Sequence, residues 1–377
     1  MRSFVYDALP GRIVFGLDAL SRLPAEVDLV SGDRVFVVTD QGTKVIADRA
    51  VDALGDRVAV TFTDIQLHVP ADGVEHATGV ATTHRSNCVV TVGGGSTTGY
   101  GKVIALNAGL PLIAVPTTYA GSEMTPIYGI TSDGRKHTER DLRVLPKAVI
   151  YDPALTVSLP PEVTGPSGMN ALAHCVEALY AKDQNPISSI VAEEGIRALA
   201  TGIPGSTRSP GDLEARSDAL YGAFLAGAAL AAVGMAIHHR ICHVLGGTFG
   251  LAHGDVNSVV LPHAASYNRE VAPEALARAA RALDASDAPT ALFDLAMEIG
   301  APTSLSQLGM DERDLDRVAE LVIDPPPWNP RPVRLDDLRA LLQDAFVGRR
   351  PEVERVAAEQ DRARREGGVR NEAPAGA

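Results

Sequence analysis

Apolar and polar residues alternate in two different ways along the chain. Up to about residue 153, short runs rich in Val, Ile and Thr are separated by stretches with helical spacing, as in strands that feed crossover helices. Strands are predicted at Asp33–Thr39, Val58–Thr63, Cys88–Val92, Leu112–Val115 and Ala148–Tyr151. Several runs are continuously apolar, as expected when helices cover both faces of a parallel sheet. The pattern predicts a Rossmann-like α/β fold.

The pattern changes after Asp152-Pro153. Ala, Leu, Glu and Arg become frequent at helical spacing, and strand signals nearly vanish. We therefore predict an α/β nucleotide-binding domain over residues 1–153 and an all-α catalytic domain over residues 154–350. Residues 351–377 begin as a charged helix and end in a segment rich in Gly, Ala and Pro. Because such a composition buries little surface, we expect this tail to be partly disordered.

Composition narrows the class of protein. The chain has 377 residues, which suits two domains, and no apolar run approaches the length that crosses a bilayer. The net charge of -13 argues against a nucleic-acid partner. Cys88, Cys175 and Cys242 are scattered, which fits reduced thiols better than disulfides. Since the first residues lack an apolar export segment, we expect a cytoplasmic protein without a membrane partner.

A glycine-rich turn follows one of the predicted strands. The segment Gly93–Thr97 comes directly after Cys88–Val92 and leads into a helical stretch. Consecutive glycines let the N–H groups at a helix start approach an anion. A turn needed only for packing would look similar, but the position between a buried strand and a helix favours a dinucleotide pyrophosphate site. The predicted cofactor-binding residues here are Gly93, Gly94, Gly95, Ser96 and Thr97.

Two further segments support a nucleotide site. Asp40 directly follows a predicted strand, where a carboxylate can bind a ribose and repel a 2′-phosphate, which favours NADH over NADPH. The segment Pro116–Ser122 follows a later strand and offers hydroxyl groups, although a threonine there could instead cap a helix. The residues that complete the predicted cofactor site are Thr117, Thr118, Ser122, Thr125 and Lys136.

Histidines gather in a few segments of the second half. Six of the ten histidines lie between residues 174 and 263, and two polar pairs are spaced four apart, which places each pair on one helical face. The candidates are Asn170 with His174, His239 with His243, and the downstream His253. A lone histidine is more often a satisfied core residue, but this arrangement indicates a shared site. We expect His238 and His263 to be structural.

The order of these segments resembles the group III, iron-containing alcohol dehydrogenases. The resemblance rests on the Gly-Gly-Gly-Ser turn, the Pro-Thr-Thr segment and the histidine helices, and extends over residues 4–348. In metal-dependent members an Asp and three His hold Fe²⁺ or Zn²⁺, and a further His transfers a proton. The resemblance places the ligand positions at Asn170, His174, His239 and His253, and the proton-transfer position at His243.

The first ligand position departs from this pattern. Asn170 stands where the metal-dependent members have Asp, and a neutral amide oxygen is a weaker ligand than a carboxylate. We therefore expect no tightly bound metal; if one is bound, His174, His239 and His253 would hold it. The same Asn, together with the segments 93–99, 140–146 and 328–332, resembles the maleylacetate reductase branch.

That branch implies a function. The expected reaction is NAD(P)H-dependent reduction of the conjugated C=C bond of maleylacetate to 3-oxoadipate in aromatic catabolism, carried out by a homodimer. We expect His243 to be the proton donor, and His253 or His239 to stabilise the enolate. The dicarboxylate needs cations, although solvated surface charges would look the same. The predicted substrate-binding residues are Lys136, Arg143, Arg331, Asn170 and His174.

Two other functions stay open on the sequence. One is a metal-dependent NAD(P) alcohol or polyol dehydrogenase of the same fold, which a chelator would inactivate. The other is a dehydroquinate synthase-like lyase, which keeps its cofactor through the cycle and so consumes no NADH.

Overall fold

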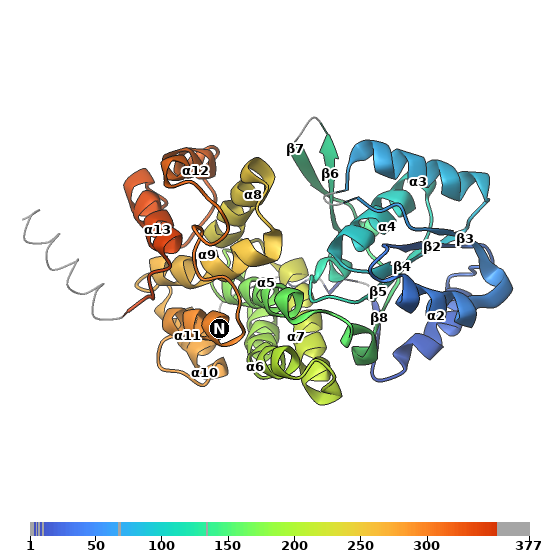
Figure 1. Cartoon of the computed structure of the whole chain (residues 1–377), viewed down its shortest axis with the longest axis horizontal. Helices are drawn as coiled ribbons and strands as arrows, with labels where there is room; N and C mark the ends of the chain where they lie inside the picture. Colours follow the sequence, from blue (N-terminus) through green and yellow to red (C-terminus); the bar gives the residue numbers. More distant parts are fainter. Residues whose placement is uncertain are drawn as a thin grey trace, which may run out of the picture.

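The computed structural model describes residues 4, 6, 8–9, 11–66, 69–132 and 135–352. One half of the protein is built on a six-stranded parallel sheet and the other half consists of helices (Figure 1). The sheet strands are β1 (Arg12–Phe15), β2 (Val35–Thr39), β3 (Val58–Phe62), β4 (Cys88–Gly93), β5 (Leu112–Pro116) and β8 (Ala148–Tyr151). The predicted fold class is thus confirmed. The predicted tail lies outside the described residues, apart from Pro351 and Glu352.

Helices cover both faces of the sheet. The helices on one face are α1 (Leu23–Leu29) and α2 (Lys44–Leu54), and those on the other are α3 (Ala71–Thr83) and α4 (Gly95–Ala108). Side chains alternate between the two layers: along β2, Val35 and Val37 pack with α1 and α2, whereas Phe36 and Val38 pack with α3 and α4. Burial on both sides explains the continuously apolar runs in the sequence.

The strand order creates a crevice at the carboxyl ends of two central strands. The order across the sheet is β1-β8-β5-β4-β2-β3, so the chain continues outward from β2 to β3 in one direction and from β4 to β5 in the other. Ligands of open α/β sheets bind where the order reverses in this way. Asp40 follows β2 and Gly94 follows β4, so both predicted cofactor residues flank this crevice.

Three strands were not predicted from the sequence. β1 is a short edge strand that pairs with β8 alone. β6 (Ile127–Ser132) and β7 (Arg135–Arg140) form a separate antiparallel hairpin that extends beside α3 (Figure 1). Every residue of β7 is polar or charged, so no alternation of apolar residues marks it as a strand.

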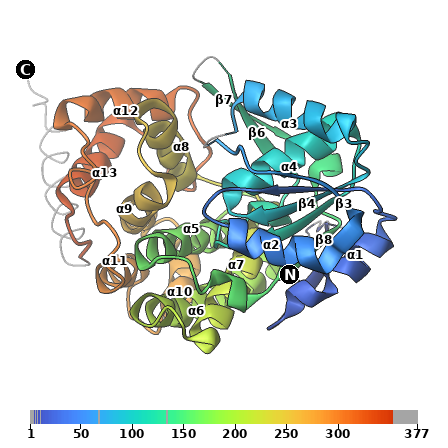
Figure 2. The same cartoon turned by 45° about the vertical axis from the view of Figure 1, so that its right-hand side comes forward.

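The second half is helical, as predicted. Its helices are α5 (Pro161–Leu179), α6 (Pro186–Arg208), α7 (Leu213–Ala232), α8 (Ile237–Phe249), α9 (His253–Tyr267), α10 (Pro273–Ala282), α11 (Ala288–Glu298), α12 (Leu315–Ile323) and α13 (Leu335–Val347). Short 3-10 helices are η1 (Ala19–Arg22), η2 (Gly55–Arg57), η3 (Ser122–Met124), η4 (Leu142–Val144), η5 (Pro153–Thr156) and η6 (Glu312–Asp314). Helix α5 is buried along most of its length and packs against α6, α7 and α9 (Figure 2). It therefore forms the centre of this half and lies next to the sheet domain.

The structure bears on two predictions, the reduced cysteines and the absence of a membrane-spanning segment. Cys88, Cys175 and Cys242 are free and buried, in agreement with the prediction of reduced thiols. Among the described residues, no single helix is long and apolar enough to cross a membrane. The pair α7 and α8, bent by 100°, would pass on length and composition, but both helices contribute many residues to the protein core.

Candidate active site

A cleft lies at the carboxyl edge of the sheet, where the strand order reverses. Its cavity of about 320 Å³ is lined by side chains and backbone from both sides of the crevice. The lining residues that the sequence predicted are Asp40, Gly94, Gly95, Ser96, Thr97, Thr117 and Thr118. Gly93 lies directly behind them at the end of β4, and its carbonyl accepts a hydrogen bond from the Thr117 N–H at 3.1 Å. The structure therefore brings together the core of the predicted cofactor site.

The glycine turn leaves room for an anion at the start of α4. Gly94 is the N-cap and no side chain caps the helix, so the first N–H groups remain available to a ligand. A methyl group at Gly94 would lie 3.1 Å from Thr118 Cγ2. Larger residues would therefore separate the glycine turn from the Pro-Thr-Thr segment and narrow the cleft.

Asp40 connects the two helices that begin at this edge. Its Oδ1 accepts from the Thr43 N–H at 3.0 Å, and its Oδ2 accepts from the Thr97 hydroxyl at 3.0 Å. The carboxylate is held between the starts of α2 and α4, in the position where it can bind a ribose. The Thr97 hydroxyl is consequently used to orient Asp40.

Two other predicted cofactor residues hold a buried lysine instead of lining the cavity. Lys102, on α4, is fully buried, and its Nζ donates to the carbonyl oxygens of Ser122, Thr125 and Ile127 at 2.6, 2.8 and 2.6 Å. Burial lowers the pKa of Lys102 to about 7, against the opposing effect of the Glu123 carboxylate. Lys102 was not among the residues predicted from the sequence. The Lys102 contacts tie the segment that leads into the β6–β7 hairpin to the cofactor helix.

The predicted histidine cluster is present. Asn170 and His174 come from α5, His239 and His243 from α8, and His253 begins α9. The ring centroids of His174 and His239 are 4.9 Å apart, those of His239 and His243 are 6.4 Å apart, and those of His243 and His253 are 6.3 Å apart. Helical spacing therefore predicted the shared site correctly.

The cluster adjoins the cofactor segment that follows β5. Asn170 Nδ2 donates to the Ala120 carbonyl at 3.4 Å. Gly121 has a φ of +77°, and a methyl group there would lie 3.1 Å from Gly227 Cα and 3.4 Å from His174 Nδ1. Glycine is needed at this point because the backbone turns in the left-handed region directly against the histidine. The cofactor segment and the histidines thus form one continuous site.

The cluster has a buried side and an exposed side. His174 and His239 are buried, whereas His243 and His253 are exposed. Burial lowers the pKa of His174 and His239 well below the usual value, and the neighbouring histidines lower it further. The buried pair is therefore neutral at neutral pH, while the exposed pair can exchange protons with solvent.

A buried carboxylate that was not predicted from the sequence orients His239 on the buried side of the histidine cluster. Glu177 Oε2 lies 2.7 Å from His239 Nδ1 and also accepts from the Ala236 N–H at 2.9 Å, and Oε1 accepts from the His238 N–H at 2.8 Å. Burial raises the pKa of Glu177, while the nearby His238 and the backbone N–H groups lower it. Glu177 follows His174 by three positions on α5, so helical spacing could have identified it.

This contact constrains the chemistry of His239. With Nδ1–H donated to the carboxylate, Nε2 carries the lone pair, and Nε2 is buried without a partner among the described residues. A neutral His239 therefore has no N–H to offer an enolate oxygen. We revise the predicted role of His239 accordingly, and the role of His253 as enolate donor stays a prediction.

Comparisons with known proteins place this arrangement in a family. Residues 10–153 match the family described as iron-containing alcohol dehydrogenase, and residues 164–346 match the C-terminal part of the Fe-containing alcohol dehydrogenase family. The chain belongs to the iron-containing alcohol dehydrogenase family. It is an oxidoreductase of this family, and the two matches together span both halves of its fold.

Several relatives within the family share one printed name. A maleylacetate reductase from Burkholderia cepacia is 48% identical over 351 residues, which cover 93% of this chain and 100% of that protein. The crystal structure of maleylacetate reductase from Agrobacterium tumefaciens has a TM-score of 0.90 and 44% identity, and covers 93% of this chain and 100% of that one. A 1,3-propanediol oxidoreductase structure is similar at 30% identity, with a TM-score of 0.86 and coverage of 92% of this chain and 100% of that one.

The family name implies a metal, and the residues fit a divalent cation by position. Asn170 Oδ1 and His239 Nε2 are buried polar atoms without a partner in the described part of the chain, and neutral imidazoles are in the form that binds metals. His174, His239 and His253 would hold the ion beside the neutral Asn170, where it would act as a Lewis acid on a carbonyl oxygen. The predicted absence of a tightly bound metal gains no support from this geometry and stays a prediction.

A second grouping of ligand atoms is a hydrogen-bonded network. Atoms of Glu177, His238 and His239 lie within 4.8 Å of one another. Both carboxylate oxygens already accept hydrogen bonds, and His238 Nε2 lies 3.4 Å from the Asn257 carbonyl and 3.5 Å from Cys242 Sγ. We therefore assign His238 a structural role and Glu177 a role behind the site.

Two of the three predicted substrate cations are in the wrong place. Arg143, on η4, is exposed and its guanidinium pairs with Asp141. Helix η4 precedes β8, so it lies at the amino edge of the sheet, opposite the cleft. The ion pair and this position remove Arg143 from the predicted substrate site.

Arg331 is also remote from the histidines. Its guanidinium stacks on the Tyr267 ring at 4.2 Å and pairs with Asp337 at 3.0 Å. Tyr267 ends α9 and His253 begins it, which separates them by about 21 Å along the helix. The prediction for Arg331 is therefore wrong. For Lys136, the structure describes the backbone position on β7 and not the side chain.

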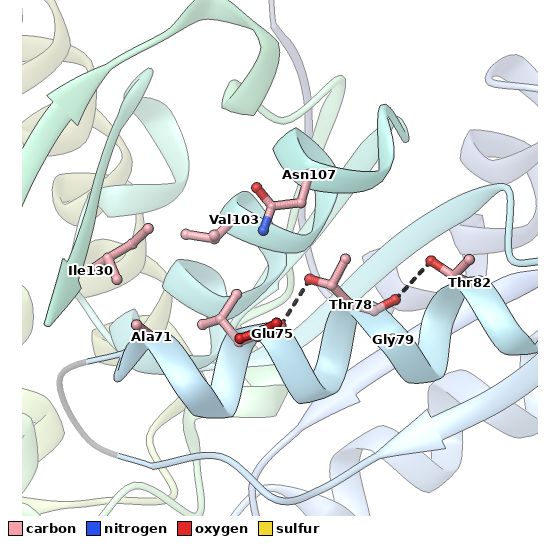
Figure 3. A pocket seen from close by; sticks show the side chains of 9 residues that line it. Ala71, Glu75, Thr78, Gly79, Thr82, Val103, Asn107 and Ile130 are labelled. Atoms are coloured by element: carbon pink, nitrogen blue, oxygen red, sulfur yellow. Dashed lines mark hydrogen bonds between the residues drawn. The ribbon is translucent and has the colours of Figure 1, made fainter. Parts of the chain in front are cut away.

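A second cavity of about 560 Å³ lies between α3 and α4, beside β6 (Figure 3). Thr78 and Thr82 donate their hydroxyls to the carbonyls of Val74 and Thr78 within α3, at 2.8 and 2.9 Å. These hydroxyls are therefore already used, and we assign the cavity no chemistry.

Proposed function

We propose that the protein reduces the conjugated C=C bond of maleylacetate to 3-oxoadipate with NAD(P)H. The observation that carries this proposal is the full-length similarity to maleylacetate reductases at 44–48% identity, joined to a nucleotide cleft that adjoins the histidine cluster. When bound, the nicotinamide supplies a hydride to the alkene carbon β to the ketone.

The residues of the chain have separate tasks in this reaction. The glycine turn and the start of α4 bind the pyrophosphate, and Asp40 binds the adenosine ribose, which supports a preference for NADH. His253 donates a hydrogen bond to the enolate oxygen that develops on the substrate, and His243 donates a proton to its α carbon. Both histidines are exposed, so His243 can be reprotonated from solvent.

Conjugate reduction does not require a metal, because the ketone itself accepts the developing charge. We propose that the enzyme works without a stoichiometric metal, and the support is the neutral Asn170 in the ligand set. The alternative is a metal-dependent alcohol or polyol dehydrogenase. The convergent imidazoles and the similarity to the 1,3-propanediol oxidoreductase structure favour it. The higher identity to maleylacetate reductases favours the first function.

The test of the proposed function is a comparison of substrates. Purified protein with maleylacetate should consume NADH in a 1:1 ratio, whereas simple alcohols or glycerol with NAD⁺ should give little turnover. Rapid oxidation of alcohols together with no reduction of maleylacetate would return the dehydrogenase to first place. Binding without net consumption of NADH would indicate the lyase.

The substrate carboxylates need cations other than Arg143 and Arg331. We propose Lys136 and Arg140, both on β7 of the hairpin. Arg140 Nη2 donates to the Ala231 carbonyl in the last turn of α7 at 3.4 Å, so this side chain extends from the hairpin to the helical half. Arg140→Met should raise KM for maleylacetate about tenfold or more, while the control Arg143→Met should leave KM unchanged. Equal effects of the two variants would contradict this choice.

Oligomeric state, location and the source of the substrate complete the proposed function. We propose a homodimer: β1 is an edge strand, and Phe15 at its end and Leu17 just after it are 40% and 57% exposed. Measurement of the molar mass in solution tests this. We also propose a cytoplasmic location and a substrate that oxidative cleavage of an aromatic ring supplies, which agrees with the dicarboxylate chemistry. We propose that neither nucleic acid nor a membrane is a partner of this protein.

A further inference from the structure

A buried guanidinium without a carboxylate partner lies behind the cofactor cleft. Arg216, on α7, is fully buried. It donates to the carbonyls of Pro210 and Leu159 at 3.0 Å each, to the Thr164 hydroxyl at 3.0 Å and to the Tyr119 hydroxyl at 3.2 Å. All four acceptors are neutral, and no carboxylate of the described residues forms an ion pair with Arg216.

Such an arrangement is costly unless something offsets the charge. Arginine is almost never fully buried without a partner, because removal of an ion from water opposes folding strongly. The four neutral acceptors satisfy N–H donors of the guanidinium but leave its net positive charge in the interior. A negative charge from a bound ligand would offset it.

The position of Arg216 indicates which ligand that is. Leu159 lines the cofactor cavity, and Tyr119 directly follows the lining residues Thr117 and Thr118. The guanidinium therefore contacts two segments of the cavity wall from behind. It also holds them in place, because each accepts one of its hydrogen bonds.

The wall itself offers no cation. Among the described residues that line this cavity, Asp40 is the one charged side chain. A dinucleotide pyrophosphate carries two negative charges, and the start of α4 supplies only about half a positive charge. An additional positive charge close behind the wall would balance the remaining negative charge of the pyrophosphate. Of the charged residues described above, Arg216 contacts the wall directly.

We propose that Arg216 is a positioning residue for the cofactor, which holds the wall segments 117–119 and 158–160 and supplies a fixed positive charge to the pyrophosphate without touching it. The inference rests on the proposed use of a dinucleotide cofactor. At an effective dielectric constant of about 20, a unit charge changes the binding of two phosphates at least tenfold even at a separation of about 10 Å.

Paired ligands separate the charge from the mechanical role. We would measure dissociation constants for ADP and for adenosine by calorimetry, in the wild type, Arg216→Met and Arg216→Lys. The field of Arg216 acts on the phosphates alone, whereas loss of its wall contacts acts on both ligands, so Arg216→Met should weaken ADP binding at least tenfold more than adenosine binding. Arg216→Lys, which keeps the charge, should recover most of the ADP affinity.

The controls keep the outcomes distinct. Arg269→Met removes another poorly exposed arginine, which pairs with Asp287 at 2.8 Å, and should leave both affinities unchanged. Arg216→Gln keeps an amide donor at the depth of the arginine Nε, which donates to the Pro210 carbonyl, and serves as the neutral variant if the methionine variant does not fold. Equal weakening of ADP and adenosine binding would leave Arg216 only its mechanical role and would overturn the proposed charge effect. Failure of the wild type to bind ADP or NADH would instead refute the proposed cofactor use.

Discussion

Glu177→Gln is the variant that tests most sharply how the buried side of the histidine cluster is organised. The carboxylate receives three N–H donors, from Ala236 at 2.9 Å, His238 at 2.8 Å and His239 Nδ1 at 2.7 Å. Glutamine is almost the same size but keeps only one oxygen. In either orientation of the amide, its NH₂ group faces at least one buried backbone N–H.

The expected loss of stability follows from this count of acceptors. One buried donor without a partner costs about 1–3 kcal/mol, and the remaining hydrogen bonds lose their charge assistance. We expect the free energy of unfolding to fall by about 2–4 kcal/mol. If the amide donates to His239 Nδ1, the ring proton moves to Nε2 and the side presented to the active site changes from acceptor to donor. Altered support of this kind typically lowers activity by about 10- to 100-fold.

The assay combines urea unfolding with steady-state kinetics on maleylacetate and NADH. Glu193→Gln is the matched control, because Glu193 pairs with Arg278 and Arg281 in a less buried place. That variant should lose less than about 1 kcal/mol and keep its kcat. Glu177→Asp keeps the charge and should recover part of the activity. Wild-type stability and kcat in Glu177→Gln would refute the assigned role of this carboxylate.

Three further predictions concern the histidines and the metal. His243→Ala should lower kcat by about 10²- to 10⁴-fold while NADH affinity is unchanged; near wild-type turnover would move the proton-donor role to His253. Dialysed enzyme should hold no stoichiometric metal and should stay active in EDTA. Asn170→Asp should bind Zn²⁺ more tightly without reducing maleylacetate faster. One equivalent of metal in the native enzyme, lost together with activity in EDTA, would show that Asn170 does not disable the metal site. Burial, with a contribution from Arg349, lowers the pKa of His263 from 6.5 to about 4, so its neutral form stabilises the fold above pH 6.5 and this stability is lost as the pH falls toward 4. His263→Leu should remove up to about 3 kcal/mol of that pH dependence in urea unfolding between pH 6.5 and 4, and stability curves that stay parallel to the wild type would contradict the assignment.

Much of the fold was determined by local sequence pattern. The predicted strands at Cys88–Val92 and Ala148–Tyr151 correspond to β4 and β8, because a continuous apolar run suits a strand that helices cover on both faces. The hairpin was missed for the opposite reason. The polar segment Arg135–Arg140 becomes a strand through its pairing with β6, and a pairing partner is not visible in a local pattern.

The site divides in the same way. Helical spacing determined that Asn170 and His174 share a face, as do His239 and His243, and a glycine turn after a strand correctly predicted the place of the cleft. Spacing along one element is a local property, so the sequence is sufficient for it.

Only the tertiary structure decided which charged residues serve the site. Arg143 pairs with Asp141 on the far edge of the sheet, while Glu177 and Arg216 are buried behind the cluster and the cleft. Whether a charged side chain is solvated, paired or buried depends on neighbours that are distant in sequence, and burial changes its electrostatic effect severalfold. The sequence therefore predicted which residues line the cleft and form the histidine cluster, whereas packing between elements decided which charged residues surround them.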